Sequence, residues 1–280
     1  MVESSEKQIV TYSRNQMFRV WDIAEEKCVK FFKSQHSIVL DIEMQNNLIA
    51  AGTSERTVCV YDYRKGYPTH VLRGHKGIIT KVCFHPQAEK LQVIASSVDN
   101  SIRIWDLLMN TCVAVLGHSS PCSTFTFTPD GNTLLSAHRD KRIIVWNLLT
   151  KIKTANIEFD EEIEAMHYCT KHKSAHHLVT FGEKGIPRIF DLTTKEFVFN
   201  TPQHPPQPFM RCFYLKKANE LVGVTTEQNL ISYGLEFNES KIPQLVYKKD
   251  CVGFHDEILD VAYDLAHHRI ILATNSTLLK

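Results

Sequence analysis

The stretch "LRGHKGIITKVCFHPQAEKLQVIASSVDNSIRIWDL", residues 72–107, decides the fold. It opens with Gly74-His75, it ends with Trp105-Asp106, and Asp99 stands six residues before the tryptophan. Short apolar runs divided by turn residues lie between, and a further run, "TCVAVLG", follows at 111–117. Runs of four to seven residues that are rich in Val, Ile, Phe and Thr predict β-strands. Residues 78–117 therefore predict four antiparallel strands joined by short turns.

The pattern recurs along the chain. An aromatic residue that ends a strand-like run and precedes a turn residue recurs at spacings of 40, 44, 41, 44 and 43 residues. The positions are Trp21, Tyr61, Trp105, Trp146, Phe190 and, more weakly, Tyr233. Four strands in a period of about 40 to 45 residues are typical of one propeller blade. We predict an all-β propeller of about six complete four-stranded antiparallel blades plus a partial one, with no long helix.

Both ends of the chain predict incomplete blades. Only the strands 7–12 and 17–21 fit before Trp21, so the first blade is expected to lack its opening strand. Residues 251–280 start another blade, with strands at 257–263, 269–274 and 276–280, and leave out its outer strand. We therefore predict that residues 1–250 form a first propeller, incompletely closed, and that the chain is part of a longer one, because exposed strand edges promote aggregation. Whether 251–280 complete this propeller or begin a second one stays open.

Composition limits the classes of function. The 280 residues include 32 basic and 31 acidic side chains, for a formal net charge of +1, which argues against a general nucleic-acid binder with a basic face. The eight cysteines form no CxxC pair, which favours a reducing compartment without disulfides. No secretory signal and no apolar run of membrane-spanning length occurs.

The Gly-His, the Asp six residues before the tryptophan and the Trp-Asp pair resemble a WD40 repeat, most closely in residues 72–107 and 116–147. The resemblance implies that these side chains form a structural hydrogen-bond network inside each blade. Such a buried network stabilises when every member has a partner. The implied members are His75, Ser97 (or Ser96), Asp99 and Trp105 in one blade, and His118, Ser136, Asp140 and Trp146 in the next.

Three stretches narrow the resemblance to one WD40 subfamily: Ser96–Trp105, Leu135–Trp146 and Asp256–Lys280. They are similar to the tandem-propeller subunits of the UTP-B complex in the small-subunit processome. This resemblance implies a non-catalytic scaffold of ribosome biogenesis in the nucleolus, which serves pre-18S rRNA processing. Its implied partners are UTP-B-like proteins of a large ribonucleoprotein, with U3 RNA or pre-rRNA contacted mostly indirectly, and no membrane, cofactor or small-molecule substrate. The alternative is a substrate receptor of a ubiquitin ligase or a signalling adaptor.

Three other site hypotheses follow from the residues. The chain has no GxGxxG after a strand, no GxxxxGK[ST] and no GxSxG, so we do not expect an enzyme. Cys169, His172, His176 and His177 have spacings that reach one tetrahedral metal ion, although a solvated hairpin loop is the favoured interpretation and we predict no metal site. The basic turn of Arg139, Lys141 and Arg142 could contact RNA phosphate or an acidic partner, with a solvated turn again favoured.

Overall fold

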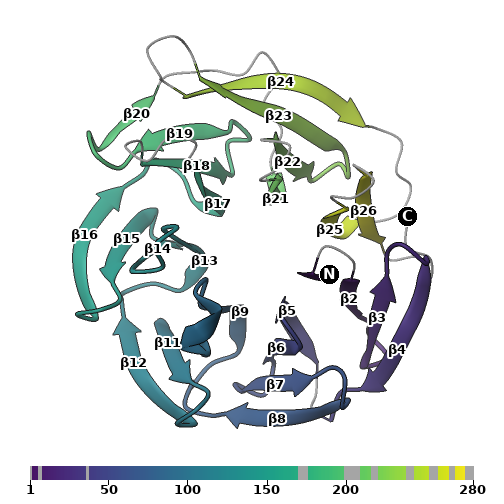
Figure 1. Ribbon diagram of the computed structural model, residues 1–280. Coiled ribbons are helices and arrows are strands. Elements are labelled where there is room, and N and C mark those ends of the chain that lie inside the picture. Colours follow the sequence, from purple (N-terminus) through teal and green to yellow (C-terminus); the bar gives the residue numbers. More distant parts are fainter. Residues whose placement is uncertain are drawn as a thin grey trace. The chain divides into compact units, whose positions relative to one another are not determined.

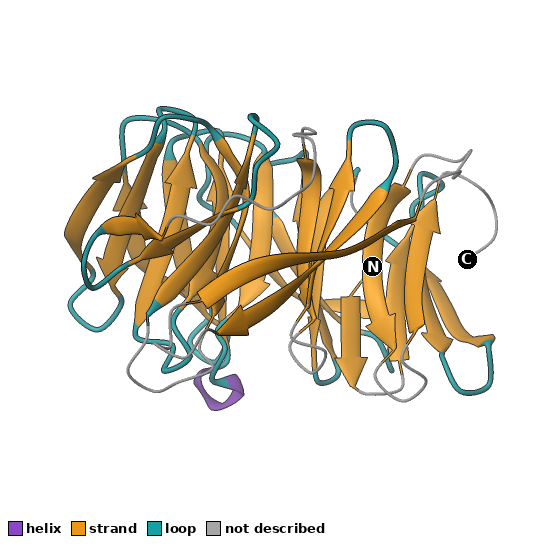
Figure 2. Ribbon diagram, turned by 90° about the horizontal axis from the view of Figure 1, so that it is seen from above, coloured by secondary structure: helices purple, strands orange, loops and turns teal. Residues whose placement is uncertain are grey.

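Strands make up nearly all the regular structure of this protein. The computed structural model describes residues 2–5, 8–35, 38–169, 176–198, 209–215, 220–237, 243–251, 258–264 and 269–274. Within these ranges the only helical element is the 3-10 turn η1, Ala88–Lys90 (Figure 2). The predicted all-β class is confirmed. The described residues contain no helix with the length and apolarity needed to cross a bilayer.

The strands pair into four-stranded antiparallel sheets whose members follow one another in the chain (Figure 1). The chain divides into two compact units, the first comprising Met1–Cys122 and Asp260–Ala273. The first sheet of this unit is β1 (Val2–Ser5), β2 (Gln8–Tyr12), β3 (Met17–Asp22) and β4 (Lys27–Lys33). The second is β5 (Val39–Gln45), β6 (Leu48–Thr53), β7 (Val58–Asp62) and β8 (Tyr67–Leu72). The third is β9 (Ile79–Phe84), β10 (Gln92–Ser97), β11 (Ser101–Asp106) and β12 (Thr111–Gly117).

The second unit holds the next three sheets within Ser123–Leu259. The fourth sheet is β13 (Cys122–Phe127), β14 (Thr133–His138), β15 (Arg142–Asn147) and β16 (Ile152–Glu158). The fifth is β17 (Ile163–Cys169), β18 (His177–Gly182), β19 (Arg188–Asp191) and β20 (Glu196–Val198). The sixth is β21 (Phe209–Leu215), β22 (Glu220–Thr225), β23 (Leu230–Phe237) and β24 (Pro243–Cys251). A two-stranded sheet, β25 (Ile258–Asp264) and β26 (Arg269–Thr274), follows, as the predicted partial blade requires.

The expectation that the first sheet lacks its opening strand is wrong. Residues Val2–Ser5 form β1, which pairs antiparallel with β2 through Val2 opposite Val10 and Glu3 opposite Ile9. The sequence "VESS" has a single apolar residue, so apolar periodicity does not reveal this strand. Residues 2–5 become a strand because they pair with an edge of β2 that would otherwise stay unpaired. The division of the chain at residue 250 stays a prediction.

The turn between the second and third strands of each sheet is built alike. In the third sheet Ser97 pairs with Ser101 across a three-residue loop, and the last loop residue, Asn100, has φ 61°. A three-residue hairpin loop of this kind ends in a left-handed residue. That residue lies five positions before the aromatic of each repeat: Gln16, Arg56, Asn100, Lys141, Gly185 and Gln228, all at φ between 61° and 68°. Only one of the six is glycine, although glycine adopts a positive φ at the lowest cost. The geometry of the short loop therefore imposes the left-handed conformation on residues that carry a Cβ.

The hydrophobic core lies between successive sheets. One cluster joins Val10, Phe18 and Val20 of the first sheet to Ile49 and Tyr61 of the second. The Phe18 and Tyr61 rings are 5.0 Å apart between centroids. Another cluster joins the second and third sheets, and a further one joins the fifth and sixth. A single blade cannot bury both of its apolar faces, so each sheet depends on its neighbour for a core.

Polar side chains also link the first strands of neighbouring sheets. On β5, Asp41 accepts a hydrogen bond from the Val82 amide of β9 at 2.8 Å, and Glu43 accepts one from the Phe84 amide at 2.5 Å. Gln45 adds a bond from its side-chain amide to the His85 carbonyl oxygen at 3.0 Å. These bonds satisfy backbone groups that an edge strand would leave unpaired. They fix the register of one sheet against the next.

Candidate functional site

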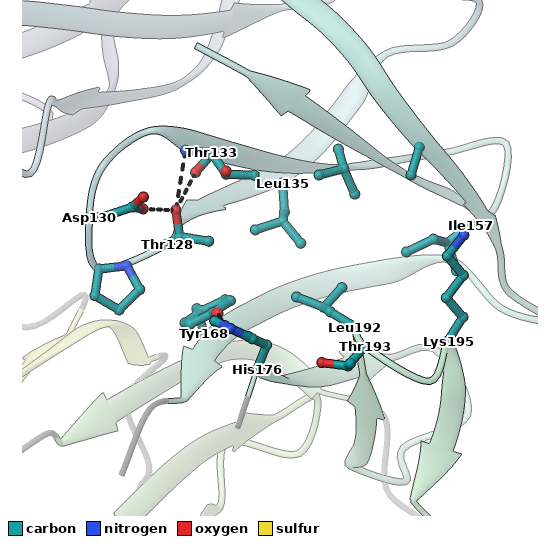
Figure 3. Close-up of a pocket in the computed structure, with 13 residues that line it drawn as sticks. Thr128, Asp130, Thr133, Leu135, Ile157, Tyr168, His176, Leu192, Thr193 and Lys195 are labelled. Carbon is teal, nitrogen blue, oxygen red and sulfur yellow. Dashed lines mark hydrogen bonds between the residues drawn. The ribbon is translucent and has the colours of Figure 1, made fainter. Parts of the chain in front are cut away.

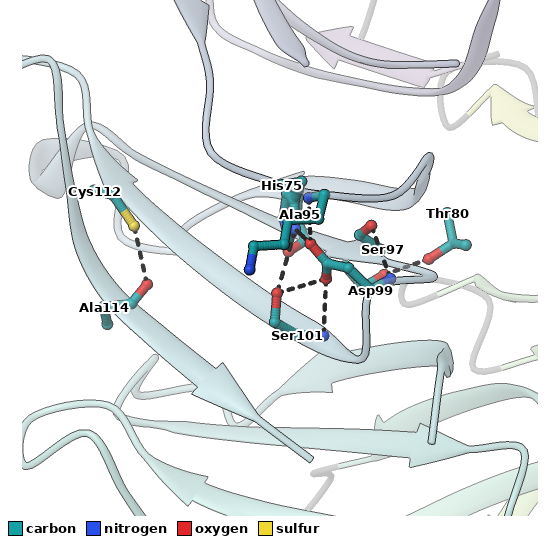
Figure 4. Close-up of polar contacts among 10 residues, drawn as sticks. His75, Thr80, Ala95, Ser97, Asp99, Ser101, Cys112 and Ala114 are labelled. Atoms are coloured by element: carbon teal, nitrogen blue, oxygen red, sulfur yellow. Dashed lines mark hydrogen bonds and ion pairs between the residues drawn. The ribbon is translucent and has the colours of Figure 1, made fainter. Parts of the chain in front are cut away.

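The polar groups of the third sheet meet at the turn between β10 and β11 (Figure 4). His75 Nδ1 donates to the Asp99 carboxylate at 2.9 Å, and the backbone N–H of Lys76 donates to the same oxygen at 2.7 Å. Ser101 donates from its hydroxyl at 2.6 Å and from its amide at 3.0 Å to the other oxygen. Both Asp99 oxygens are engaged, so this carboxylate ties the segment before β9 to the β10–β11 turn.

Burial and hydrogen bonding shift the pKa values of both His75 and Asp99. Burial would raise the pKa of Asp99, but the hydrogen bonds from Ser101, Lys76 and His75 outweigh it and lower that pKa to about 2. Burial lowers the pKa of His75, and the bond to Asp99 opposes this effect. Hydrogen bonds to the charged form of a carboxylate favour that form, so the four donors hold Asp99 ionised within the turn.

Sequence reasoning expected a serine to carry the network from His75 to Trp105, and the structure places the serines elsewhere. Ser97 accepts a hydrogen bond from the Asp99 amide at 3.2 Å, and Ser96 bonds Thr80 at 2.9 Å. The Trp105 indole N–H is buried and has no hydrogen-bond partner among the described residues. His75 instead meets Trp105 ring edge to face, with centroids 5.3 Å apart.

In the fourth sheet the tryptophan does reach a serine. The Trp146 indole N–H donates to the Ser136 hydroxyl at 2.9 Å, and that hydroxyl lies 2.8 Å from His138 Nε2. His138 was not among the expected members, because it does not follow a glycine as His75 does. Its signal was its position on β14, two residues after Ser136 on the same face of the strand.

The two remaining expected members of that blade are His118 and Asp140. His118 belongs to the first compact unit, where its backbone N–H donates to the Asn100 carbonyl at 3.1 Å. Asp140 lies 3.9 Å from the Arg142 guanidinium in the β14–β15 turn. Membership of a common network for His118, Ser136, Asp140 and Trp146 stays a prediction.

The fifth sheet reverses the charges of this turn. Lys184 occupies the position that Asp99 holds in the third sheet, six residues before the aromatic, and the acid stands instead before β17. Glu161, only 3% exposed, accepts the Lys184 amide at 2.9 Å and pairs with Arg188 at 3.3 Å. A Cβ at Gly182 would collide with the Glu161 carboxylate, which explains the glycine. The segment before the first strand and the turn between the second and third strands are thus again joined by a carboxylate. In the fifth sheet the carboxylate belongs to the segment before β17, whereas in the third sheet it belongs to the turn.

Two residues of the basic turn form ion pairs with acids of their own unit. Arg139 pairs with Glu162 at 3.5 Å, and Arg142 pairs with Glu158 at 3.2 Å. Lys141 carries the left-handed φ of the turn, at 63°. Two of the three predicted contact residues therefore already have an acidic partner.

The Asp or Asn that follows the first five repeat aromatics has a role that the sequence analysis did not assign. Its side-chain oxygen accepts hydrogen bonds from backbone amides two or three residues ahead, and thereby closes the turn from the third strand to the fourth. The acceptors are Asp22, Asp62, Asp106, Asn147 and Asp191, at 2.7–3.4 Å. The recurrence of a short polar acceptor at one offset was the signal.

The metal candidate is only partly visible, because His172 lies outside the described residues. Cys169 is buried, and burial raises the pKa of its thiol to about 12. His177 lies 3.9 Å from Asp191, and His176 hydrogen-bonds the Tyr168 hydroxyl. No cluster of three metal-ligating side chains occurs in the part of the chain that the structure describes.

Comparisons with known proteins agree with the repeat geometry. The family described as nucleolar protein 10-like, N-terminal domain, matches residues 9–147. Transducin beta-like protein 3 of Mus musculus is 31% identical over 97% of this chain, and the Homo sapiens protein is 28% identical over 97%. Autophagy-related protein 16 of Arabidopsis thaliana is 22% identical over 67% of this chain.

The chain spans 35% of the length of the mouse and human transducin beta-like proteins and 37% of the Arabidopsis protein. The chain has six four-stranded antiparallel sheets, with a hydrogen-bonded Asp or Asn after the aromatic in five of them. These repeats are WD40-like, and the chain is similar to transducin beta-like protein 3 over 97% of its length.

Proposed function

We propose that this chain is a non-catalytic scaffold of ribosome biogenesis that acts within the UTP-B complex of the small-subunit processome, in the nucleolus. The observation that carries the proposal is the 31% identity to transducin beta-like protein 3 over 97% of this chain. The nucleolar description of the family that matches residues 9–147 supports the location. Because the chain covers about a third of these relatives, the role of the whole relative is carried over as a proposal.

The chemistry of the described polar groups supports a scaffold. Asp99 is saturated by four donors, and Glu161 is held by Lys184 and Arg188. Carboxylates that are hydrogen-bonded or ion-paired in this way hold turns rigid, and a rigid scaffold positions the loops that bind partner proteins. A catalytic base needs a free lone pair near the proton that it removes.

The ion pairs of the basic turn favour indirect association with RNA. Binding of phosphate by Arg139 or Arg142 would have to break the pairs with Glu162 and Glu158. The acids around this turn also repel phosphate. Protein partners are therefore proposed as the main contacts, with U3 RNA or pre-rRNA held through them.

Affinity purification of the tagged full-length protein from nuclear extract tests the proposal. The expected result is recovery of the other UTP-B proteins together with U3 RNA, measured by mass spectrometry and by quantitative reverse transcription. Recovery of cullin-type ligase components without U3 RNA would favour the ubiquitin-ligase receptor instead and would overturn the proposal.

A triple variant separates direct from indirect RNA association. In Arg139→Ala/Lys141→Ala/Arg142→Ala we expect U3 recovery within about twofold of the wild type, with the recovered proteins unchanged. A loss of U3 while the UTP-B proteins are retained would show that this turn contacts RNA directly. Lys151→Ala/Lys153→Ala, which removes two exposed positive charges at the residue before β16 and near its start, is the control for charge lost elsewhere on the same sheet.

A further inference from the structure

The second compact unit contains a pocket of about 670 Å³ between the fourth and fifth sheets. It opens at the ends of the sheets where β13 turns into β14 and where β19 turns into β20 (Figure 3). Neither the predicted networks nor the basic turn contributes a residue to it. Cavities of roughly 300–1,000 Å³ are the size that binds a compact ligand or a few anchoring side chains.

The floor of the pocket is an apolar row that crosses three strands. Leu135, Val145 and Ala155 lie side by side in register on β14, β15 and β16. The corresponding row of the third sheet, Ile94, Ile104 and Ala114, is 0%, 4% and 8% exposed. In the fourth sheet only Leu135 is buried, and Val145 and Ala155 remain half-buried. The third sheet covers this row, whereas in the fourth sheet part of it stays accessible to an apolar group.

The two ends of the pocket carry opposite charges. Figure 3 shows Asp130 at one end and Lys195 at the other, with Leu135 and Leu192 between them. The Thr128 hydroxyl bonds Asp130 at 2.5 Å, and this bond lowers the pKa of the Asp130 carboxyl, which keeps it negative. Lys195 is exposed and makes no ion pair within the described part of the chain.

Hydrogen bonds hold the rim between these two ends. The Tyr168 hydroxyl is bonded to His176, and burial, followed by the nearby charge of Asp130, raises the pKa of Tyr168 to about 12. The Thr193 amide is held by Asp191 at 2.7 Å, so the turn that presents Lys195 is closed. A pocket whose walls are already ordered loses little entropy on binding.

We propose that this pocket docks a short segment of a partner protein that carries a basic residue at one end, one or two apolar side chains in the middle and an acidic residue at the other end. The apolar side chains occupy the row of Leu135, Val145 and Ala155, the basic residue faces Asp130, and the acidic residue faces Lys195. The opposite charges at the two ends set the direction of the segment, as complementary charges set register at other interfaces. This inference rests on the proposed role as a protein-binding scaffold, and it does not depend on which assembly the scaffold serves.

Selection from a random heptapeptide display library on the full-length protein tests the proposal. Enriched peptides are resynthesised with a fluorescent label, and their affinities are measured by fluorescence anisotropy. The expected result is a consensus with the order basic, apolar, acidic. Enrichment of no peptide, or of peptides without this order, would overturn the proposal.

Two variants locate the bound peptide, and each has a matched control. Ala155→Phe fills the floor and is expected to weaken binding at least tenfold, whereas Asn156→Phe, on the other face of the same strand, leaves it within about twofold. Lys195→Glu is expected to weaken binding about tenfold, and the loss is recovered by a peptide whose acidic end is changed to lysine. Lys151→Glu is the control, because Lys151 has the same φ of 60° in the equivalent turn of the fourth sheet but lies outside the pocket.

The outcomes separate this proposal from the proposed function. Equal affinity for Ala155→Phe and the wild type, with unchanged melting temperatures, would place the peptide elsewhere and overturn the pocket proposal. Recovery of UTP-B proteins and U3 RNA by Ala155→Phe, alongside lost peptide binding, would leave both proposals standing. If the wild-type protein binds the selected peptide but recovers no U3 RNA, the proposed role in ribosome biogenesis is overturned and the pocket proposal stands.

Discussion

At the scale of single residues, the indole N–H of each repeat tryptophan depends on one side chain ten positions earlier. Thr11 accepts from Trp21 and Ser136 accepts from Trp146, each at 2.9 Å. Ala95 stands at this position before Trp105, and its methyl group cannot accept a hydrogen bond. In all three sheets this position lies two residues after the residue that pairs with the tryptophan, so the register is the same.

We expect Ala95→Ser to stabilise the protein and Ser136→Ala to destabilise it. A buried donor without a partner costs about 1–3 kcal/mol, so the first change removes such a cost and the second creates one. The melting temperatures of both variants, measured by calorimetry, check the prediction. A lower melting temperature for Ala95→Ser would mean that the hydroxyl does not reach Trp105.

Asp99 gives a residue-scale prediction that depends on pH. The hydrogen bonds that outweigh burial lower its folded-state pKa to about 2, whereas an unfolded Asp has a pKa of about 3.9. The carboxylate therefore contributes stability above about pH 4, and this contribution is lost as the pH falls towards 2.

We expect Asp99→Asn to lower the unfolding free energy at pH 6 and to have a smaller effect at pH 3. Urea denaturation of both proteins at the two pH values provides the measurement. The half-buried Asp106, which lies outside the His75 contact, serves as the control in Asp106→Asn. An Asp99→Asn effect that is the same at both pH values would contradict the assignment.

At the scale of elements, the turn from the third strand to the fourth ends in a left-handed residue five positions after the aromatic. These residues are Glu26, Gly66, Asn110, Lys151 and Lys195, at φ between 51° and 79°. Residues with a Cβ lose roughly 1–2 kcal/mol in this conformation, and glycine does not. The Asp or Asn that caps the turn compensates for this strain.

We expect Gly66→Ala to destabilise the second sheet by about 1 kcal/mol, because alanine is strained at φ 79°. Lys151→Gly, at φ 60°, is expected to leave stability unchanged or raise it slightly, because relief of strain offsets the entropy that glycine loses. Chemical denaturation of the two variants gives the comparison. Equal losses in both variants would show that turn conformation is not the controlling factor.

Glu43 makes the link between β5 and β9 sensitive to pH. Burial, partly opposed by the bond from the Phe84 amide and reinforced by the charge of Asp41, raises its pKa to about 8. An unfolded Glu has a pKa of about 4.3, so the folded state binds an extra proton between these values. The contribution of Glu43 is complete below about pH 4 and is lost as the pH rises through 8.

We expect Glu43→Gln, which keeps an acceptor for the Phe84 amide, to be more stable relative to the wild type at pH 8 than at pH 5. Urea denaturation at the two pH values measures the difference. Glu25→Gln, in an exposed turn, is the control and should show no such trend. A constant difference between Glu43→Gln and wild type would rule out titration of this carboxyl.

At the scale of the whole molecule, stability is shared between neighbouring sheets. Because each described core cluster joins two successive sheets, a cavity in one cluster should loosen that pair of sheets before any other. Repeat proteins follow this nearest-neighbour rule when each unit contacts only the next one.

We expect Phe18→Ala to cost about 3–5 kcal/mol, because the side chain is fully buried against Phe32 and Tyr61. Hydrogen exchange measured by mass spectrometry should show faster exchange in residues 8–72 and unchanged rates in residues 209–251. Uniformly faster exchange over both regions would contradict pairwise coupling and would indicate one cooperative unit.

The repeat period and the strands were predictable because both depend on local pattern. The run "TCVAVLG" corresponds to β12 and "RIILAT" to β26. Short apolar runs bounded by turn residues favour the β-strand, in which successive side chains point to opposite faces. Strand β1 was missed because "VESS" owes its conformation to the neighbouring edge of β2. Its own residues carry no strand signal.

The network residues were predictable in type and only partly in connection. Asp99 and His75 follow from their offsets, since the turn brings them together wherever the repeat folds. The partner of each tryptophan follows from pairing across strands, and His138 follows from its place two residues after Ser136 on β14. The role of Glu161 follows from packing that no offset encodes. The sequence by itself determined the period, the strands and the turn acids, because these depend on neighbours within a few residues. Only the tertiary structure decided which buried atom found a partner and where an apolar row stayed open, because both depend on how side chains distant in the chain fill the space between sheets.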